Sequence, residues 1–364
     1  MKQKKIIIFM PSIEGGGVEK NLFLISNFLS SKFKKIKLIT SSNNTQKVNK
    51  KIDITKYGLF NFFDNRTLKI IFSGILLFFE LLKSKNVIIF SFQANLYAIL
   101  IAKLFKIKVI IRLNSSPSGW LSQKWKKELF RKIYSLSDLV IVNSNEFKEE
   151  LWKKLRIKSY CIYNPLNKKT IIKKSNYKIK NNPYKIKNAL RIINIGRLVD
   201  QKDHFTLLKS ICSIKKSLKV EVIIIGNGRN ENKLKSFIEK NRLSKIVKIL
   251  NFKQNPFPFI KLSELFILTS RYEGLPNVLL EAMTLKKFII SSNCPTGPRE
   301  ILNNGKNGML FKAGSHKELT RKIIKYSKNK SRYNIKAKIA INTLDKYDLK
   351  INLNEYYFQI LKLF

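Results

Sequence analysis

The sequence predicts an α/β protein built from two doubly wound, mostly parallel sheets. First, short apolar runs alternate with helical segments in both halves of the chain, as in sheets whose parallel strands are joined by helices. Second, a length of 364 residues suits two domains of ordinary size better than one core. Third, a stretch rich in Asn and Lys separates the two series of elements.

The first series is expected to form an N-terminal domain over residues 1–168. Its first strand, at 4–10, contains only five consecutive apolar residues, too few for the core of a signal peptide. A loop with glycines at 15–17 follows, and a helix begins near Val18. Taken alone the loop is a flexible turn, although its glycines also let the backbone approach another molecule closely. Further strands are predicted at 36–41, 87–92, 107–112, 138–143 and 159–163, and helices at 67–84, 95–105, 121–136 and 145–155.

The most hydrophobic stretch of the chain, residues 70–82, is predicted to be a buried helix. Ser73, Gly74 and Glu80 interrupt it. It is also shorter than the roughly 20 apolar residues that span a bilayer.

The second series begins after a predicted linker at residues 169–188, which has little periodicity. It is expected to form a C-terminal domain over residues 189–345. The chain is expected to end with a helix at 346–362, within a segment 346–364 that crosses back over the first domain. The strands of the second domain are predicted at 190–195, 219–225, 246–250, 265–268 and 287–292.

Two carboxylates bracket the start of a helix predicted after the buried strand 265–268. Glu273 and Gly274 lie in the loop, Pro276 suits the first helical turn, and Glu281 lies one turn further on. The free N–H groups of such a helix start attract anions. By itself Glu273 could complement the helix dipole and Glu281 could be a solvated helix carboxylate. With the glycine loop, the arrangement indicates a cradle for a sugar nucleotide.

A second candidate site follows the strand 190–195, where Gly196 and Arg197 come shortly before Lys202. An arginine and a lysine five residues apart can converge on a diphosphate, the arginine by a forked contact and the lysine as a point charge. The alternative is an ordinary basic surface loop. Gly226, at the end of the strand 219–225, opens a Gly-Asn-Gly loop that lacks the third glycine of a dinucleotide fingerprint.

These stretches, in this order, resemble the retaining glycosyltransferases of family 4. The E-x7-E spacing of Glu273 and Glu281 matches the family's donor-site signature, and the run GGGVEK at 15–20 resembles its N-terminal glycine loop. The run CPTGPRE at 294–300 resembles bacterial polysaccharide and lipopolysaccharide transferases. The resemblance implies the GT-B fold, in which two Rossmann-like domains face each other across a cleft. It also implies transfer of a hexosyl or N-acetylhexosaminyl group from a nucleoside diphosphate to a lipid-linked saccharide, in capsule, O-antigen or lipopolysaccharide biosynthesis.

The resemblance assigns catalytic roles to Arg197, Lys202 and Glu273. The two cations would stabilise the leaving diphosphate, Glu273 would hold hydroxyls of the donor sugar, and Glu281 would hold the ribose. The other donor-site residues that it implies are Gly15, Gly16, Gly196, Gly226, Phe252, Gly274, Leu275, Pro276 and Asn277. Asn114 stands where many members of the family have a histidine. An amide cannot titrate near neutrality, so the role of that histidine does not transfer.

Neither a cofactor nor a metal is expected, because the nucleotide sugar is a substrate and the chain has no D-x-D motif. The three cysteines lack the spacing of a metal or disulfide framework, which fits a reducing compartment. His204 and His316 are far apart in the sequence, and ordinary surface or loop roles are expected for both.

The formal net charge of +49 implies attraction to a polyanion, unless it reflects an AT-rich coding bias. The helix at 121–136 combines an apolar stripe with five cations, so it could lie on an anionic membrane or pack its stripe on its own sheet. The stripe consists of Leu121, Trp125, Leu129, Ile133 and Leu136, and Trp120 precedes it.

The expected partners are therefore a nucleotide sugar, a lipid-linked saccharide acceptor and an anionic membrane surface. We expect a cytoplasmic protein, peripheral on the cytoplasmic face of the membrane. Nucleic acid is not an expected partner, because base-stacking aromatics are not interleaved with the basic residues. The alternatives are a nucleotide-sugar epimerase on the same scaffold and a nucleic-acid-binding protein. The sequence makes no prediction of oligomeric state.

Overall fold

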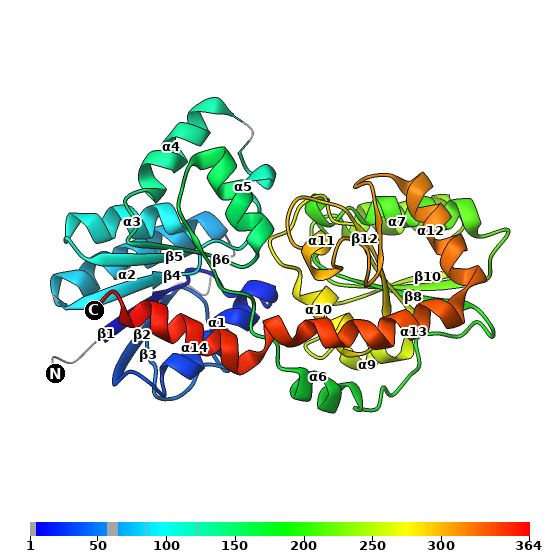
Figure 1. Cartoon of the computed structure of the whole chain (residues 1–364), viewed down its shortest axis with the longest axis horizontal. Coiled ribbons are helices and arrows are strands. Elements are labelled where there is room, and N and C mark those ends of the chain that lie inside the picture. Colours follow the sequence, from blue (N-terminus) through cyan, green and yellow to red (C-terminus); the bar gives the residue numbers. More distant parts are fainter. Residues whose placement is uncertain (1–4, 57–64, 85, 122) are drawn as a thin grey trace. The chain divides into compact units, whose positions relative to one another are not determined.

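The computed structural model describes residues 5–56, 65–84, 86–121 and 123–364, and divides the chain into two compact units (Figure 1). Unit 1 consists of Met1–Pro165 together with Leu349–Phe364, and unit 2 of Leu166–Asp348. Residue 4 of the predicted first strand and residue 122 of the predicted basic helix lie outside the described residues.

The described strands of unit 1 form one parallel sheet in the order β3-β2-β1-β4-β5-β6-β7. Isoleucine-rich strands such as β1 are buried on both faces because helices cover both sides of the sheet. The chain order reverses between β1 and β4, which pair in parallel, so the loops after these two strands meet there. The strands are β1 (Lys5–Phe9), β2 (Lys35–Thr40), β3 (Asp53–Lys56), β4 (Val87–Ser91), β5 (Lys108–Arg112), β6 (Leu139–Val142) and β7 (Tyr160–Cys161).

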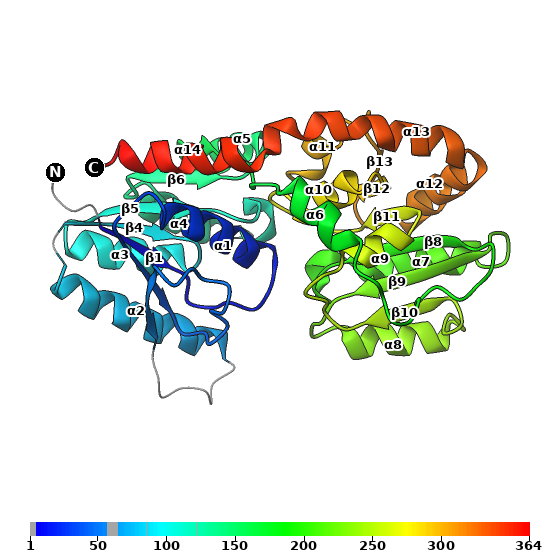
Figure 2. The same cartoon turned by 90° about the horizontal axis from the view of Figure 1, so that it is seen from below.

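The helices of unit 1 divide between the two faces of its sheet (Figures 1 and 2). α1 and α14 bury apolar side chains in the core on one face, and α2 to α5 bury theirs in the core on the other. The C-terminal helix is therefore part of the N-terminal unit. The helices are α1 (Gly17–Leu29), α2 (Arg66–Leu82), α3 (Asn95–Leu104), α4 (Lys124–Tyr134), α5 (Asn145–Leu155) and α14 (Leu349–Leu361), with the 3₁₀ turn η1 (Pro117–Gly119).

A fully buried arginine ties α14 into unit 1. Arg112 ends β5, and its Nε donates to the hydroxyl of Tyr356 on α14 at 2.8 Å. Its Nη2 donates to Oδ1 of Asn164 at 2.5 Å. A buried guanidinium is stable only where its N–H groups have partners, so these bonds fix the C-terminal helix against the end of β5.

Unit 2 repeats the same design with the strand order β10-β9-β8-β11-β12-β13. β8 lies between β9 and β11, which makes the gap between β8 and β11 the place where the chain order reverses. The strands are β8 (Leu190–Ile195), β9 (Val220–Ile225), β10 (Val247–Leu250), β11 (Leu265–Leu268), β12 (Phe288–Ser292) and β13 (Met309–Phe311). The helices are α6 (Lys168–Ser175), α7 (His204–Ile214), α8 (Glu231–Lys240), α9 (Phe257–Leu262), α10 (Asn277–Thr284), α11 (Pro298–Ile301), α12 (His316–Lys328) and α13 (Lys330–Ala340), with the 3₁₀ turns η2 (Asp200–Lys202) and η3 (Ile341–Tyr347).

The predicted α/β class with two doubly wound sheets is confirmed, and each predicted strand is present within a few residues. The short edge strands β3 and β13 were not predicted. The segment expected to be a linker contains α6, which begins where Oδ1 of Asn167 accepts from the backbone N–H of Thr170. The basic helix is shorter than predicted, since it begins only at Lys124 and ends at Tyr134.

Two burial predictions are wrong. The apolar helix at 70–82 is not buried: it faces the sheet with Leu77 and Leu81 but leaves a row of large apolar side chains exposed. One helix can cover the sheet with only one of its faces, so an all-round apolar sequence leaves the other face uncovered. His204 is not a surface residue, since its side chain is 2% exposed at the start of α7. No helix among the described residues combines the length and apolarity needed to cross a bilayer.

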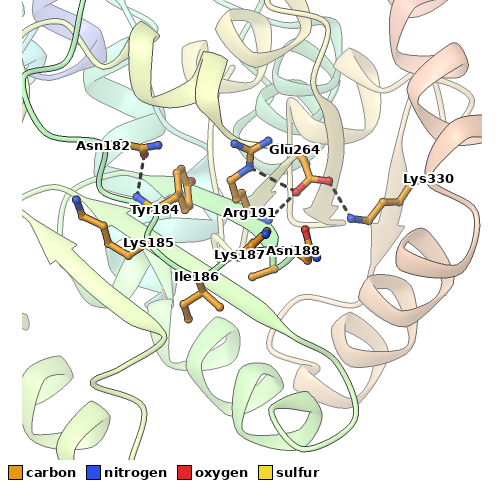
Figure 3. A pocket seen from close by; sticks show the side chains of 10 residues that line it. Asn182, Tyr184, Lys185, Ile186, Lys187, Asn188, Arg191, Glu264 and Lys330 are labelled. Atoms are coloured by element: carbon orange, nitrogen blue, oxygen red, sulfur yellow. Dashed lines mark hydrogen bonds and ion pairs between the residues drawn. The ribbon is translucent and has the colours of Figure 1, made fainter.

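A polar network occupies the end of the unit 2 sheet where its strands begin, around a cavity of 590 Å³ (Figure 3). Glu264, just before β11, accepts from the backbone N–H of Arg191 at 3.0 Å and from Nζ of Lys330 at 2.8 Å. Burial alone would raise the pKa of Glu264, but these bonds hold it below its ordinary value. The network therefore fixes α13 and the start of β8 to the sheet.

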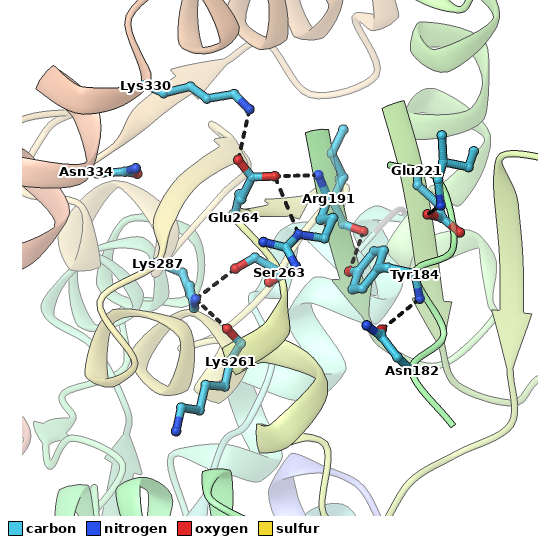
Figure 4. A network of polar contacts seen from close by, with 12 residues as sticks. Asn182, Tyr184, Arg191, Glu221, Lys261, Ser263, Glu264, Lys287, Lys330 and Asn334 are labelled. Carbon is cyan, nitrogen blue, oxygen red and sulfur yellow. Dashed lines mark hydrogen bonds and ion pairs between the residues drawn. The ribbon is translucent and has the colours of Figure 1, made fainter. Parts of the chain in front are cut away.

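Glu221 lies in the same region, and its side chain is fully buried within β9 (Figure 4). Its carboxylate accepts from the backbone N–H groups of Lys185 and Ile186, each at 2.8 Å, and from Nζ of Lys248 at 2.9 Å. Although burial acts to raise its pKa, these hydrogen bonds hold the pKa of Glu221 below its ordinary value. Glu221 thus attaches the segment that leads into β8 to the neighbouring strand.

Replacing this carboxylate by an amide should destabilise unit 2. In Glu221→Gln, the amide nitrogen would face backbone donors, so we expect a loss of about 1–3 kcal/mol of unfolding free energy in urea titrations. Glu239→Gln, the same change at an exposed position of α8, should stay within about 0.5 kcal/mol of wild type. Equal stability of the two variants would contradict the role given to Glu221.

Candidate functional site

The two predicted donor loops come together at the carboxyl ends of β8 and β11. The loop after β8 contains Gly196, Arg197 and η2, and the loop after β11 contains Glu273. Gln201 joins them. Its side-chain Nε2 donates to the backbone carbonyl of Tyr272 at 2.9 Å, and its backbone carbonyl accepts from the backbone N–H of Arg271 at 2.8 Å. Open α/β sheets bind ligands at this kind of place, where the chain order reverses.

An ion pair between Lys202 and Glu273 lies at the junction of the loops. Nζ of Lys202 is 2.5 Å from Oε1 of Glu273, and their side chains are only 16% and 8% exposed. The hydroxyl of Ser270 donates to the same oxygen at 2.5 Å. An ammonium has three N–H donors, so the pairing leaves Lys202 able to donate to a ligand as well. A positive group held in place by a carboxylate is suited to binding an oxyanion.

Glycines allow the loops to pack this closely. A Cβ on Gly226 would lie 1.9 Å from the carbonyl oxygen of Gly196, so the loop after β9 can touch the loop after β8 only if Gly226 has no side chain. In the same way, a Cβ on Gly297 would lie 2.4 Å from the carbonyl oxygen of Gly274. The hydroxyl of Thr296 donates to the carbonyl of Glu273 at 2.7 Å, which fixes the loop from its other side.

Helix α10 begins directly after these contacts. Gly274, Leu275 and Pro276 are buried, and Asn277 is the first residue of the helix. Glu281 is 5% exposed and lies one turn into α10. The helix start thus places N–H donors and the buried carboxylate of Glu281 on the segment that also carries Glu273.

Two predicted residues do not take part in the ion pair of Lys202 and Glu273. Arg197 is exposed, next to Gly196. Phe252 is 52% exposed, and its backbone N–H donates to Oδ1 of Asn227 at 2.8 Å, which ties it to the loop of Gly226. Both lie on loops at the same edge of the sheet, and both leave their side chains accessible to a ligand.

The predicted glycine loop, with Gly15 and Gly16, belongs to unit 1 and precedes α1. Glu19 of the first turn of α1 is buried, and a Cβ on Gly16 would lie 2.8 Å from its Oε2. Oε1 of Glu19 accepts from the backbone N–H of Glu14 at 3.3 Å. Within unit 1, the space beside Gly16 is therefore occupied by a carboxylate of the same chain.

Asn114 has both ends of its amide engaged. Its Oδ1 accepts from Nη1 of Arg112, and its Nδ2 donates to the carbonyl of Phe92 at 2.8 Å. A protonated imidazole at this position would face a buried guanidinium, which is unfavourable. The buried Arg112 therefore favours a neutral hydrogen-bonding side chain, such as an amide, at position 114.

Two titratable side chains near the pair are held neutral. Burial, with a smaller contribution from the neighbouring charge of Glu273, raises the pKa of the Cys294 thiol to about 12. Burial, assisted by the charge of Lys202, lowers the pKa of His204 to about 4. A neutral thiol at physiological pH is a poor nucleophile, so Cys294 acts here as a packing residue.

Sequence reasoning missed Ser270 and Thr296 as functional residues. Each donates a hydrogen bond that holds Glu273 in position. Ser270 was visible as a polar residue directly after a buried strand, and Thr296 lies in the CPTGPRE run, but neither position shows which atom it contacts. Across residues 5–56, 65–84, 86–121 and 123–364 there is no cluster of three or more His, Cys, Asp or Glu side chains that could hold a metal ion.

Comparison with known families matches each half of the chain to a family model. Residues 15–169 match the model described as Glycosyltransferase Family 4, and residues 176–343 match the model described as Glycosyl transferases group 1. The second of these regions contains the predicted donor-site residues of unit 2.

Two relatives and one solved structure illustrate the similarity. An uncharacterized glycosyltransferase of Methanocaldococcus jannaschii is 35% identical over 56% of this chain and 53% of its own length, so the match spans about half of that relative. An N-acetylgalactosamine-N,N'-diacetylbacillosaminyl-diphospho-undecaprenol 4-alpha-N-acetylgalactosaminyltransferase of Campylobacter jejuni is 25% identical over 71% of this chain and 73% of its own length. HepE of Anabaena, solved with UDP and glucose, superposes with a TM-score of 0.78 at 17% identity and covers 99% of this chain and 100% of its own. This likeness shows the fold, the GT-B architecture of two Rossmann-like domains.

The buried His204 should make the protein less stable in acid. Its pKa of about 4 lies below the ordinary value of 6.5, so the unfolded chain binds more protons between these pH values. Unfolding free energy should therefore fall as the pH drops from 6.5 towards 4, by up to about 3 kcal/mol from this group. Urea titrations of wild type and His204→Phe at several pH values measure the difference.

His316→Phe provides the control, because it removes the other histidine of the chain. It should keep the acid sensitivity of the wild type, whereas His204→Phe should lose most of the part due to this group. The same pH dependence in both variants would show that His204 is not held neutral by the fold.

Proposed function

We propose that this chain, which belongs to the family 4-type glycosyltransferases, transfers a sugar from a nucleoside diphosphate to a hydroxyl of a lipid-linked saccharide. The sugar would be a hexosyl or N-acetylhexosaminyl group, and its anomeric configuration would be retained. The observation that carries this proposal is the ion pair between the partly buried Lys202 and the buried Glu273 at the junction of the two loops. It places a cation and a carboxylate beside a helix start, within a region that matches the family. These groups suit a diphosphate and the hydroxyls of a sugar.

The leaving diphosphate gains charge as the bond to the sugar breaks. Arg197 and Lys202, with the N–H groups at the start of α10, would stabilise that charge more in the transition state than in the ground state. Glu273 would accept from hydroxyls of the donor sugar, and Glu281 from those of the ribose. Gly196, Gly226 and Gly274 would let the backbone approach the donor, and Phe252 would lie near its base. The glycine loop of unit 1, with Gly15 and Gly16, would contact the donor phosphates or the acceptor.

In a retaining transfer of this kind, the acceptor hydroxyl attacks on the face that the diphosphate leaves. The donor phosphate itself would take the proton of that hydroxyl, so the chain need not supply a general base. Cationic side chains would neutralise the diphosphate, and we propose that the reaction requires no metal ion.

A lipid-linked acceptor is the substrate class that we propose. The name of the Campylobacter relative specifies a saccharide on diphospho-undecaprenol as its acceptor. We extend this class of acceptor to the present chain, and with it a role in surface polysaccharide biosynthesis. Since nucleotide sugars are cytosolic and such an acceptor lies in a membrane, the enzyme would act as a peripheral protein at the cytoplasmic face. The net charge of +49 would favour an anionic surface.

The test is a screen of radiolabelled nucleotide sugars against lipid extracts that contain lipid-linked saccharides. We expect label from one donor to enter the lipid fraction, with and without excess chelator, and the new linkage to keep the donor's anomeric configuration by NMR. An incubation with donor alone separates the epimerase alternative, because rapid conversion without acceptor would favour it. Donor conversion without transfer to any acceptor would overturn the proposal, and inversion at the anomeric carbon would overturn its retaining mechanism.

Removing either cation should slow the transfer. We expect Arg197→Ala and Lys202→Ala to lose about a hundredfold or more in turnover, because each would remove a positioned transition-state donor. Thermal melts should accompany the assays, since Lys202→Ala also leaves the buried Glu273 without its partner. The exposed Arg197 avoids that complication.

The matched control is Lys209→Ala, which removes an exposed cation from α7 and should leave turnover unchanged. If folded Arg197→Ala and Lys202→Ala proteins stay within about threefold of wild type, neither residue takes part in the mechanism.

A further inference from the structure

Helix α2 leaves a stripe of large apolar side chains uncovered. Five apolar residues of α2 are 38–56% exposed. Neighbouring members of this set are one, three or four positions apart in the sequence, which places all five on one side of the helix. They are Ile71, Ile75, Phe78, Phe79 and Leu82. On the neighbouring α3, Tyr97, Leu100 and Leu104 are 47–74% exposed at helical spacing.

The two stripes form one continuous surface, which we name the α2–α3 face. A Cβ on Gly74 of α2 would lie 3.6 Å from Cδ1 of Ile101, so the two helices are in close contact. The rings of Phe78 and Phe105 meet edge to face with centroids 5.2 Å apart. Beneath them, α2 and α3 share one buried core. Contiguous exposed apolar surface of this kind marks an interaction site rather than ordinary surface scatter.

Helix α4 adds a cationic border. It packs beside α3 and exposes Trp125 and Leu129, at 62% and 41%. Trp120, in contrast, packs against Phe130 with ring centroids 4.5 Å apart and lies partly buried against the protein's own core. Helices α2, α3 and α4 together carry eight cationic residues against two carboxylates.

Both of these carboxylates are paired within unit 1. Glu80 accepts from Lys5 and Lys37, and Glu128 pairs with Arg131. The border of the α2–α3 face is therefore positive and the face itself apolar. A second copy of the chain would bring an equally positive border against it, which is unfavourable. An anionic bilayer offers both the apolar interior and the opposite charge.

We propose that the α2–α3 face inserts into the interfacial region of an anionic lipid bilayer, with the cations of α4 at the headgroups. Aromatic side chains such as Trp125 and Tyr97 suit that depth because each has an apolar ring and a polar atom. The inference rests on the proposed function for its purpose, which is to hold unit 1 at the membrane that contains the acceptor. The docking itself is measured without any substrate.

The test is co-sedimentation of the full chain with vesicles of phosphatidylcholine alone or of phosphatidylcholine mixed with phosphatidylglycerol, at low and high salt. We expect binding to the anionic vesicles. The double variant Phe79→Gln/Leu104→Gln changes two side chains that are 56% and 74% exposed, so the fold should survive. It should weaken binding about tenfold or more, because apolar area is lost from the bilayer.

The matched control is Ile351→Gln/Phe358→Gln, which changes two apolar residues of α14, on the opposite face of the same sheet, that are 62% and 54% exposed. It should bind as wild type does. Replacing Lys124, Lys126, Lys127, Arg131 and Lys132 by Gln should remove most of the salt-sensitive part of the binding.

The inference would be overturned if Phe79→Gln/Leu104→Gln bound anionic vesicles as tightly as the wild type does. It would also be overturned if the wild type bound both kinds of vesicle equally, or bound neither. Sedimentation velocity tests whether a second copy of the chain covers the face instead. If the wild type were a dimer and this variant a monomer, with the same vesicle binding, the inference would also be overturned. If the protein did not bind vesicles but still transferred sugar to an acceptor dispersed in detergent, only this inference would be wrong. Docking without any nucleotide-sugar turnover would overturn only the proposed function.

Discussion

The ion pair between Lys202 and Glu273 is the interaction on which the candidate site depends. It joins the loops after β8 and β11, two neighbouring strands whose carboxyl ends meet where the chain order of the sheet reverses. Removing two charges from water is costly, so such a pair persists only with further hydrogen bonds around it. Here the hydroxyl of Ser270 donates to the same carboxylate oxygen as Lys202, and Thr269 Oγ1 donates to the carbonyl of Lys202 at 2.8 Å.

Direct backbone contacts at glycines also hold the site loops together. The loops after β8 and β9 approach through Gly196 and Gly226, and the loops after β11 and β12 through Gly274 and Gly297. Each contact leaves no room for a Cβ, so any other residue at Gly226 or Gly297 would push two site loops apart. The donor site that we propose is thus a set of loops in backbone contact, with the partly buried cation of Lys202 at their junction.

The sequence was enough to predict the fold class, and local patterns also indicate the loops that we propose for the donor site. Isoleucine-rich runs predict buried strands, and glycine with Arg197 and Lys202 after such a run indicates an anion site. That Lys202 pairs with Glu273 could not be predicted, since the contact joins residues 71 positions apart and depends on strand order. The family and its fold, which the motifs predicted by resemblance, are confirmed.

Burial was the least predictable property. Hydropathy identifies α2 as apolar but does not say how much of a helix its sheet can cover, so the exposed α2–α3 face was missed. His204 has a polar sequence context, yet its ring is enclosed at the start of α7. The edge strand β3 was missed because its sequence DITK contains a single apolar residue, and β13 because a run of three apolar residues shows no alternation.

A double-mutant cycle on unfolding free energy tests most directly whether the pair holds the two loops together. Lys202→Met and Glu273→Gln are each expected to cost about 3 kcal/mol, because each leaves one charge of the largely water-excluded pair without its partner. The double variant should lose less than the sum of the two, by at least about 1 kcal/mol. Additive losses, equal to the sum within about 0.5 kcal/mol, would show that the two side chains do not stabilise each other and would contradict this account of the site.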